Sequence, residues 1–98
     1  MRKKVKLPGI YLISSIMHPD RVYVGSAINT PTRKWRHFNE LEKDIHCNSK
    51  MQRHVNKYGI DDLTFSIVEP CLPELLIQRE QYYIDTLNPY FNEYRSKL

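Results

Sequence analysis

The chain has 98 residues, a length that suits one domain with one modest hydrophobic core. It is 41% hydrophobic and 27% charged, as globular proteins are, and no apolar run is long enough to span a membrane. The basic N-terminal segment lacks an apolar stretch with a cleavage site, which argues against secretion. Cys47 and Cys71 have neither metal-ligand nor disulfide spacing, so we expect reduced thiols in a cytoplasmic protein with no membrane partner.

The net charge of +4 is unevenly distributed along the sequence. Residues 1–32 hold five Lys or Arg residues and one acid, and residues 33–58 hold seven and three. Residues 59–98 hold three Lys or Arg residues and seven acids. A basic portion beside one acidic element indicates a polyanionic partner, such as nucleic acid, and a separate place where carboxylates gather.

Two short strands open the predicted fold. Residues 9–15 and 21–25 read as strands, and the turn residues at 18–20 join them into a hairpin. If Tyr11 lies opposite Tyr23, both rings project from one face of the sheet. The aliphatic residues of the two strands then occupy the other face: Ile10, Leu12, Val22 and Val24.

A helix is predicted from about Pro31 to Asp44, because Thr30 precedes a proline that suits the first helical position. Helical spacing places four apolar residues on one stripe: Trp35, Phe38, Leu41 and Ile45. His37 borders this stripe, and Arg33 lies one turn before His37 on a different stripe.

A second helix is predicted from a cap at Asn48 or Ser49 to a stop at Gly59. Its inward face consists of Met51, Val55 and Tyr58. A basic stripe follows another face and consists of Lys50, Arg53, His54 and Lys57. Such a stripe is either a solvated face or a surface that contacts phosphates, and the spacing alone leaves both open.

Residues 63–69 form the clearest predicted strand, and a third helix follows over about residues 73–87. The element order is therefore β-β-α-α-β-α, and the hairpin makes the class α+β. Glu80 falls in the middle of the apolar stripe of the third helix. A carboxylate there needs a cation, which is either an arginine in a structural salt bridge or a metal ion at an active site.

These residues together resemble the GIY-YIG nuclease domain. The sequence reads "GIY" at 9–11 and "YVG" at 23–25, followed by Glu80 on the third predicted helix. Val24 stands where the second motif has isoleucine. Ser26 follows the glycine of this motif, as a serine does in the homing-endonuclease branch. The resemblance covers about residues 8–92 and includes the segments 33–38 and 48–59.

The resemblance implies one domain over residues 1–98, built on a small three-stranded antiparallel sheet with flanking helices. It implies an endonuclease that hydrolyses DNA phosphodiester bonds with one divalent metal ion, Mg²⁺ or Mn²⁺. Glu80 matches the metal ligand, and Arg33 matches the arginine that holds the scissile phosphate. The remaining matches are two active-site tyrosines, a histidine that assists a tyrosine, and a polar residue beside the site: Tyr11, Tyr23, His37 and Asn92. His46 corresponds to a further histidine in some homing relatives.

The chemistry of phosphodiester hydrolysis suits these residue types. Arg33 offers a permanent cation for the charge that grows on the phosphoryl oxygens. One Mg²⁺ held by Glu80 and waters would supply the Lewis acid. We expect Tyr11 to be the general base, with His37 relaying its proton and Tyr23 orienting water or phosphate; the opposite assignment of the tyrosines stays open.

Two other functions compete with an active nuclease. One is a non-catalytic nucleic-acid-binding module that retains the fold, and the other is an RNA-binding or protein-interaction module that uses the basic helix. Many relatives join this domain to a separate DNA-binding part. A domain of this size reads few base pairs alone, so we expect relaxed specificity, a separate DNA-binding domain or a homodimer.

Overall fold

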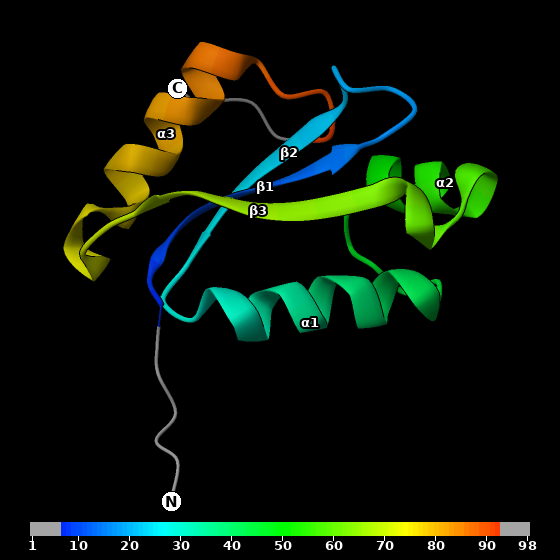
Figure 1. The fold of residues 1–98 in the computed structure, drawn as a ribbon, viewed down its shortest axis with the longest axis horizontal. Coiled ribbons are helices and arrows are strands. Elements are labelled where there is room, and N and C mark those ends of the chain that lie inside the picture. Colours follow the sequence, from blue (N-terminus) through cyan, green and yellow to red (C-terminus); the bar gives the residue numbers. More distant parts are fainter. Residues whose placement is uncertain (1–6, 93–98) are drawn as a thin grey trace, which may run out of the picture.

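The structure is a computed structural model that describes residues 7–92. Three strands form one antiparallel sheet in the order β2-β1-β3 (Figure 1). Their bounds are Gly9–Ser15 for β1, Val22–Ala27 for β2 and Leu63–Pro70 for β3. Three helices complete the fold, α1 (Thr30–Glu42), α2 (Ser49–Tyr58) and α3 (Leu76–Leu87), with short 3₁₀ turns η1 (Ile60–Asp62) and η2 (Pro73–Leu75). The predicted α+β class and the order β-β-α-α-β-α are confirmed.

The sheet is covered on both faces, with α1 on one side and α3 on the other (Figure 1). On the first face Tyr11 and Ile13 pack with Leu41 of α1 and Met51 of α2. On the second face Ile10 of the central strand packs with residues of β2 and α3. Because β1 is buried on both faces, every side chain of its GIY motif lies in the interior. None of the helices within residues 7–92 is long and apolar enough to cross a membrane.

The register of the hairpin differs from the predicted one by two residues. Tyr11 pairs with Gly25, and Tyr23 pairs with Ile13, so the two tyrosines do not lie opposite each other. A shift of two residues preserves the face on which each side chain lies. The prediction that both rings share one face is therefore confirmed, and the predicted pairing is wrong because the ring of Tyr11 needs the space above Gly25.

The helix α1 presents a different face to the sheet from the predicted one. Trp35 is 66% exposed and Ile45 is 64% exposed, and Ile45 follows the end of the helix at Glu42. The buried residues of α1 are Thr30, His37 and Leu41. The helix is rotated so that a histidine, rather than the tryptophan, points toward the strands. The inward position of His37 is explained by its hydrogen bonds with Tyr11 and His46, because a buried imidazole needs such partners.

The helix α2 begins and ends as its sequence predicts. The Asn48 side chain accepts a hydrogen bond from the Met51 backbone N–H, and Gly59 ends the helix with a φ of 95°. Val55 is buried with Met51, as expected. In α3, by contrast, Ile77 is 83% exposed, and the inward contacts come from other residues of the helix: Leu76, Tyr83 and Ile84.

The segment after α3 completes the core between the sheet and α1, although its sequence shows no periodicity. Phe91 is fully buried, and its backbone N–H donates to the Val22 carbonyl at the edge of β2. The Asn48 side chain donates to the Phe91 carbonyl at 2.7 Å and so ties this segment to the start of α2. The open side of β2 is thereby covered by residues that come from the end of the domain.

Candidate active site

The two motif tyrosines lie beside each other on the face of the sheet that α1 covers. Their ring centroids are 6.3 Å apart. Tyr11 has no exposed surface and stacks on Phe65 of β3 at 4.8 Å, whereas Tyr23 is half-buried and lines a polar hollow. The site therefore contains one tyrosine held rigidly in the interior and one that solvent reaches.

Gly25 of the second motif makes room for the ring of Tyr11. A Cβ added at Gly25 would lie 2.4 Å from both Cζ and Oη of Tyr11, far inside van der Waals contact. The two motifs thus form one packing unit, in which the glycine of one strand receives the tyrosine of the other. The position of the Tyr11 hydroxyl group depends directly on the missing side chain at position 25.

A directed chain of hydrogen bonds runs from the start of α2 to Tyr11. The Asn48 backbone N–H donates to Nδ1 of His46 at 3.0 Å, so a neutral His46 carries its proton on Nε2. That Nε2–H donates to Nδ1 of His37 at 2.7 Å. The proton of His37 is therefore on its Nε2, which donates to Oη of Tyr11 at 2.7 Å.

This direction changes the role expected for His37. Its free lone pair is occupied by His46, so His37 donates to the Tyr11 oxygen and does not take the proton of Tyr11. Burial lowers the pKa of His37 to about 3, and the nearby positive charges of Arg33 and Arg36 act in the same direction. His37 is therefore neutral at ordinary pH, and its N–H favours a negatively charged oxygen on Tyr11.

Arg33 of α1 reaches over the end of β2 toward the tyrosines. Its Nη1 donates to the Ser26 carbonyl at 3.4 Å. Burial raises the pKa of Tyr11 to about 12, and the charge and hydrogen bond of Arg33 oppose that rise. The Glu80 carboxylate adds to the rise, and a hydrogen bond with Tyr23 opposes it. Arg33, Tyr23 and Glu80 therefore all act on the one hydroxyl group of Tyr11.

Glu80 joins the site from the opposite face of the sheet through Ser26. The Ser26 hydroxyl group donates to Oε1 of Glu80 at 2.5 Å. The side chain is half-buried, at the boundary between α3 and β2. Within residues 7–92 no three His, Cys, Asp or Glu side chains gather into a metal cage. A single carboxylate fits Mg²⁺, which keeps most of its waters and takes one or two protein carboxylates.

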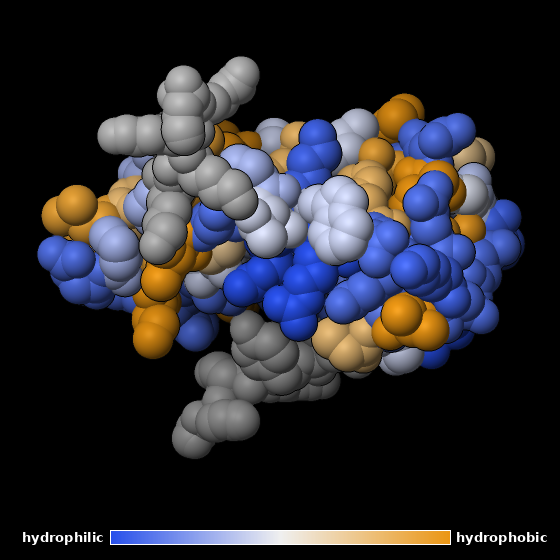
Figure 2. Space-filling view, turned by 90° about the horizontal axis from the view of Figure 1, so that it is seen from below, coloured by the Kyte–Doolittle hydropathy of each residue, from blue (hydrophilic) through white to orange (hydrophobic). Residues whose placement is uncertain are grey.

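The polar hollow beside Tyr23 has a volume of about 330 Å³. Its lining comes from β2, α1 and the loop before α2 and consists of Tyr23, Arg33, Arg36, His37, Glu40, His46 and Cys47, with Glu40 paired to Arg36 at 3.5 Å. Figure 2 looks onto the side on which α1 lies, where hydrophilic residues gather across the middle of the face. The arginines give this opening the charge that a phosphate requires.

Asn92 supports the site through the backbone of β2. Its Oδ1 accepts from the Val24 N–H at 2.8 Å, and its Nδ2 donates to the Val24 carbonyl at 3.0 Å. The amide therefore pairs with the strand edge as another strand would. Because Val24 lies between Tyr23 and Gly25, this pairing fixes the backbone that carries both.

The predicted basic stripe on α2 is only partly a surface. Arg53 and Lys57 are exposed and Lys50 is half-buried, but His54 is buried. The imidazole of His54 donates through Nε2 to Asp62 at 2.7 Å, so His54 does not belong to the exposed stripe. The residue lies inward because a buried carboxylate needs its hydrogen bond.

Asp62 and Gln52 are polar core residues that sequence reasoning missed. Asp62 accepts from the hydroxyl group of Ser15 and from the backbone N–H of Met17, and so ties the β1–β2 loop to η1. Gln52 accepts from the His46 backbone N–H at 2.9 Å and donates to the Leu41 carbonyl at 3.0 Å. Gln52 thereby fixes the loop that carries His46. An acid and an amide in mostly polar stretches gave no signal of burial.

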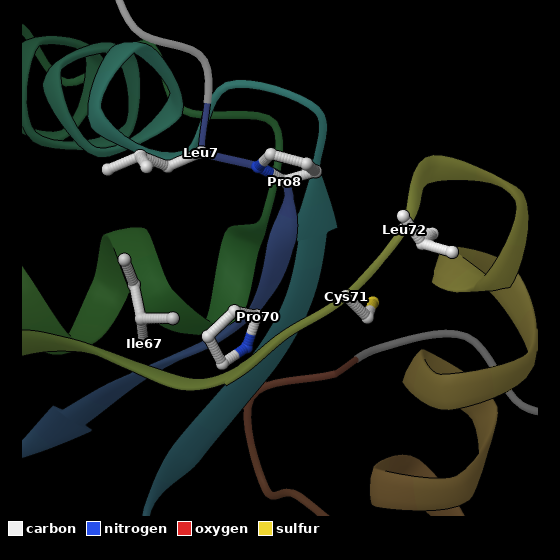
Figure 3. A pocket seen from close by; sticks show the side chains of 6 residues that line it. All are labelled: Leu7, Pro8, Ile67, Pro70, Cys71 and Leu72. Carbon is white, nitrogen blue, oxygen red and sulfur yellow. The ribbon is translucent and has the colours of Figure 1, made fainter.

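A larger, apolar groove lies away from this site, where β1 begins and β3 ends (Figure 3). It is lined by Leu7, Pro8, Ile67, Pro70, Cys71 and Leu72. Burial raises the pKa of the Cys71 thiol, and no charged side chain lines the groove within residues 7–92. Its size does not make it a site for an anionic substrate, which needs cations and hydrogen-bond donors.

Comparisons with known proteins find similar sequences and similar folds. The sequence pattern of the GIY-YIG catalytic domain matches residues 7–95. The chain is 42% identical over 88 residues to intron-associated endonuclease 1 of Enterobacteria phage T4, covering 88% of this chain and 35% of that protein. The chain thus spans about a third of the length of this relative.

Two solved structures share the fold over almost its full length. One is the catalytic domain of the homing endonuclease I-TevI, with a TM-score of 0.78, 39% sequence identity, and coverage of 93% of this chain and 99% of that chain. The other is a glutamate-to-alanine variant of the I-TevI catalytic domain, with a TM-score of 0.77, 40% identity, and coverage of 91% and 92%.

Proposed function

Because the chain belongs to the GIY-YIG catalytic domain family, we propose that it is a metal-dependent endonuclease that hydrolyses DNA phosphodiester bonds. One observation carries the proposal: Arg33 and His37 of α1 and Glu80 of α3 all act on the hydroxyl group of Tyr11. A module that only binds nucleic acid does not need a buried hydroxyl group whose ionisation is influenced by three other polar side chains. The site is that of an enzyme that moves protons beside a bound anion.

Arg33 binds the scissile phosphate in this proposal. Its guanidinium group is permanently charged and lines the hollow beside Tyr23. Charge on the phosphoryl oxygens grows as water attacks, so a fixed cation stabilises the transition state more than the ground state. The bond to the Ser26 carbonyl holds Arg33 in place before substrate arrives.

Glu80 would hold one divalent metal ion, with waters and phosphate oxygens completing the coordination. When bound, Mg²⁺ or Mn²⁺ supplies a Lewis acid for the leaving oxygen. The Ser26 hydroxyl group orients the carboxylate from the side of β2. This hydrogen bond ties the residue after the second motif to the metal ligand on α3.

The two tyrosines share the removal of the proton from water. Tyr23 is the half-exposed one, so its hydroxyl group meets the attacking water. Tyr11 accepts this proton as the phenolate, a minor form reached by loss of its proton to solvent because its pKa is raised to about 12, and His37 and Arg33 stabilise the negative charge on that oxygen. From this form, water gives its proton to Tyr23 as Tyr23 gives its own to Tyr11, which ends as the neutral hydroxyl group. The chain of His46 and His37 keeps the acceptor oriented.

Cleavage of supercoiled plasmid tests the proposed function. We expect the purified protein to convert it to nicked and linear forms with Mg²⁺ or Mn²⁺, and EDTA to abolish the conversion. Since the relative from phage T4 is about three times longer than the matched region, a separate DNA-binding domain or a homodimer would supply target specificity. Cleavage that persists in EDTA, or intact plasmid with either metal, contradicts the proposal.

A further inference from the structure

A second hollow, of about 140 Å³, lies beside α2 and takes no part in the proposed chemistry. Its lining consists of four Lys or Arg residues, one histidine and two tyrosines: Arg21, Lys50, Arg53, Lys57, His54, Tyr58 and Tyr90. Within residues 7–92 no carboxylate lines it. Arg53 and Lys57 are four residues apart on one helix, where like charges repel. The hollow is therefore suited to an anion that would relieve this repulsion.

Arg21 is fixed in the hollow by Tyr90 and His54, which come from two different parts of the chain. Its guanidinium carbon lies 4.9 Å from the centroid of the Tyr90 ring. Its Nη1 donates to Nδ1 of His54 at 3.2 Å, and His54 is in turn bonded to the buried Asp62. The buried network thus positions a surface cation. A guanidinium group fixed in this way loses little conformational freedom when it binds phosphate.

Lys50 approaches the same ring from α2. Its Nζ lies 4.7 Å from the Tyr90 centroid and donates to the Tyr90 carbonyl at 3.2 Å. Two cations from different elements therefore share one aromatic ring. Tyr90 holds the two charges at fixed positions, which a loosely solvated basic face does not require.

The two hollows are joined by the short segment at the start of α2. His46 and Cys47 line the hollow beside Tyr23, and Lys50 lines the second one. Asn48 lies between them, where it caps α2 and donates to His46. A polyanion bound at the arginines of the first hollow therefore reaches the second after crossing only this segment.

We propose that the second hollow binds a backbone phosphate that flanks the phosphate to be cut, and so positions the DNA duplex for cleavage. This inference rests on the proposed function. Contacts to phosphates fix register and orientation and carry no sequence information. The hollow therefore contributes affinity and alignment, and leaves sequence selection to other parts of the protein or to a partner.

A salt titration of DNA binding tests the inference. We compare the wild-type protein with the double variant Arg53→Gln/Lys57→Gln, which changes exposed side chains outside the core. The control is Lys34→Gln/Lys43→Gln, which removes two exposed charges outside the hollow. Binding of a labelled duplex of about 20 base pairs is followed by fluorescence anisotropy in EDTA, at several salt concentrations.

The hollow variant should bind about tenfold or more weakly at low salt. Its slope of log K against log salt should be shallower by about one for each phosphate that it no longer neutralises. The control variant should keep a slope that is steeper than that of the hollow variant. The variant Arg21→Gln should weaken binding similarly, with an unchanged circular dichroism spectrum as the test that it folds.

Equal slopes of log K against log salt for the hollow variant and the wild-type protein would overturn the inference. Cleavage by the wild-type protein would still support the proposed function in that case. A charge effect confined to an RNA duplex would also overturn the inference. If the wild-type protein binds duplex DNA through the hollow and never cuts it with Mg²⁺ or Mn²⁺, the proposed function fails and the binding site stands.

Discussion

The imidazole of His46 never touches Tyr11, yet it determines how Tyr11 is held. Because Asn48 donates to one ring nitrogen of His46, the other nitrogen must donate to His37. We expect His46→Ala to slow single-turnover cleavage by about tenfold or more, since His37 loses its hydrogen-bond partner and its fixed tautomer. Affinity for DNA in EDTA should remain within about twofold. A wild-type rate in this variant would exclude His46 as a positioning residue.

Gly25 gives the sharpest steric test of the tyrosine arrangement. In Gly25→Ala the new methyl group would occupy the space of the Tyr11 hydroxyl group, so the ring must move. We expect a loss of stability of about 1–3 kcal/mol in chemical denaturation and a larger loss of cleavage than stability alone explains. Gly59→Ala is a useful comparison, because its Cβ meets nothing within 4 Å and its cost comes from a φ of 95°. Full activity in Gly25→Ala would contradict the packing role.

At the scale of an element, Asn92 stabilises the outer edge of β2. We expect Asn92→Ala to lower the free energy of unfolding by about 1–3 kcal/mol, because the Val24 backbone loses both of its partners in the Asn92 amide. Urea denaturation measures this loss, and Asn39→Ala on α1 is the matched control. Equal stability of the two variants would show that water replaces the Asn92 amide without cost.

The elements were predictable from sequence because their signals are local. The Asn48 cap, the Gly59 stop and the alternation of β3 each depend on a few neighbouring residues. The register of the hairpin was not predictable, since it depends on the fit of Tyr11 over Gly25 across two strands. The rotation of α1 was missed for a similar reason. The apolar stripe suggested that Trp35 points inward, whereas hydrogen bonds from other elements draw His37 inward instead.

The candidate site shows the same division. The order of the two motifs, Arg33 and Glu80 was enough to predict which residues gather, through resemblance to a family. Neither the direction of the hydrogen bonds through His37 nor the burial of His54 followed from the sequence. Both depend on contacts between residues far apart in the chain, such as the one between His54 and Asp62.

For the whole molecule, the free energy of unfolding depends on pH because two buried groups, His37 and Asp62, have lowered pKa values. The pKa of His37 is lowered to about 3, so below pH 6.5 the unfolded chain binds a proton that the folded protein does not. Burial raises the pKa of Asp62, but hydrogen bonds from Ser15 and His54 outweigh it and lower the pKa to about 2. Its contribution to stability is therefore present above pH 3.8 and is lost as the pH falls toward 2.

We expect the free energy of unfolding to fall as the pH is lowered from about 6.5 to 3, and this fall to be smaller in His37→Gln. The variant removes the proton uptake at position 37 and leaves Asp62 unchanged. Urea titrations at a series of pH values measure both curves. Parallel curves for the two proteins would show that His37 does not remain neutral in the folded state.

We propose that Glu80 and the groups around Tyr11 form a catalytic site for DNA cleavage, and Glu80 offers its sharpest test. The most direct measurement is the single-turnover rate of duplex cleavage in Mg²⁺ for wild type, Glu80→Gln and the exposed control Glu74→Gln, with DNA affinity measured in parallel. We expect a loss of at least about 100-fold in Glu80→Gln, with affinity in EDTA no weaker than wild type and a control that cuts normally. Cleavage by Glu80→Gln at the rate of the control would contradict this proposal.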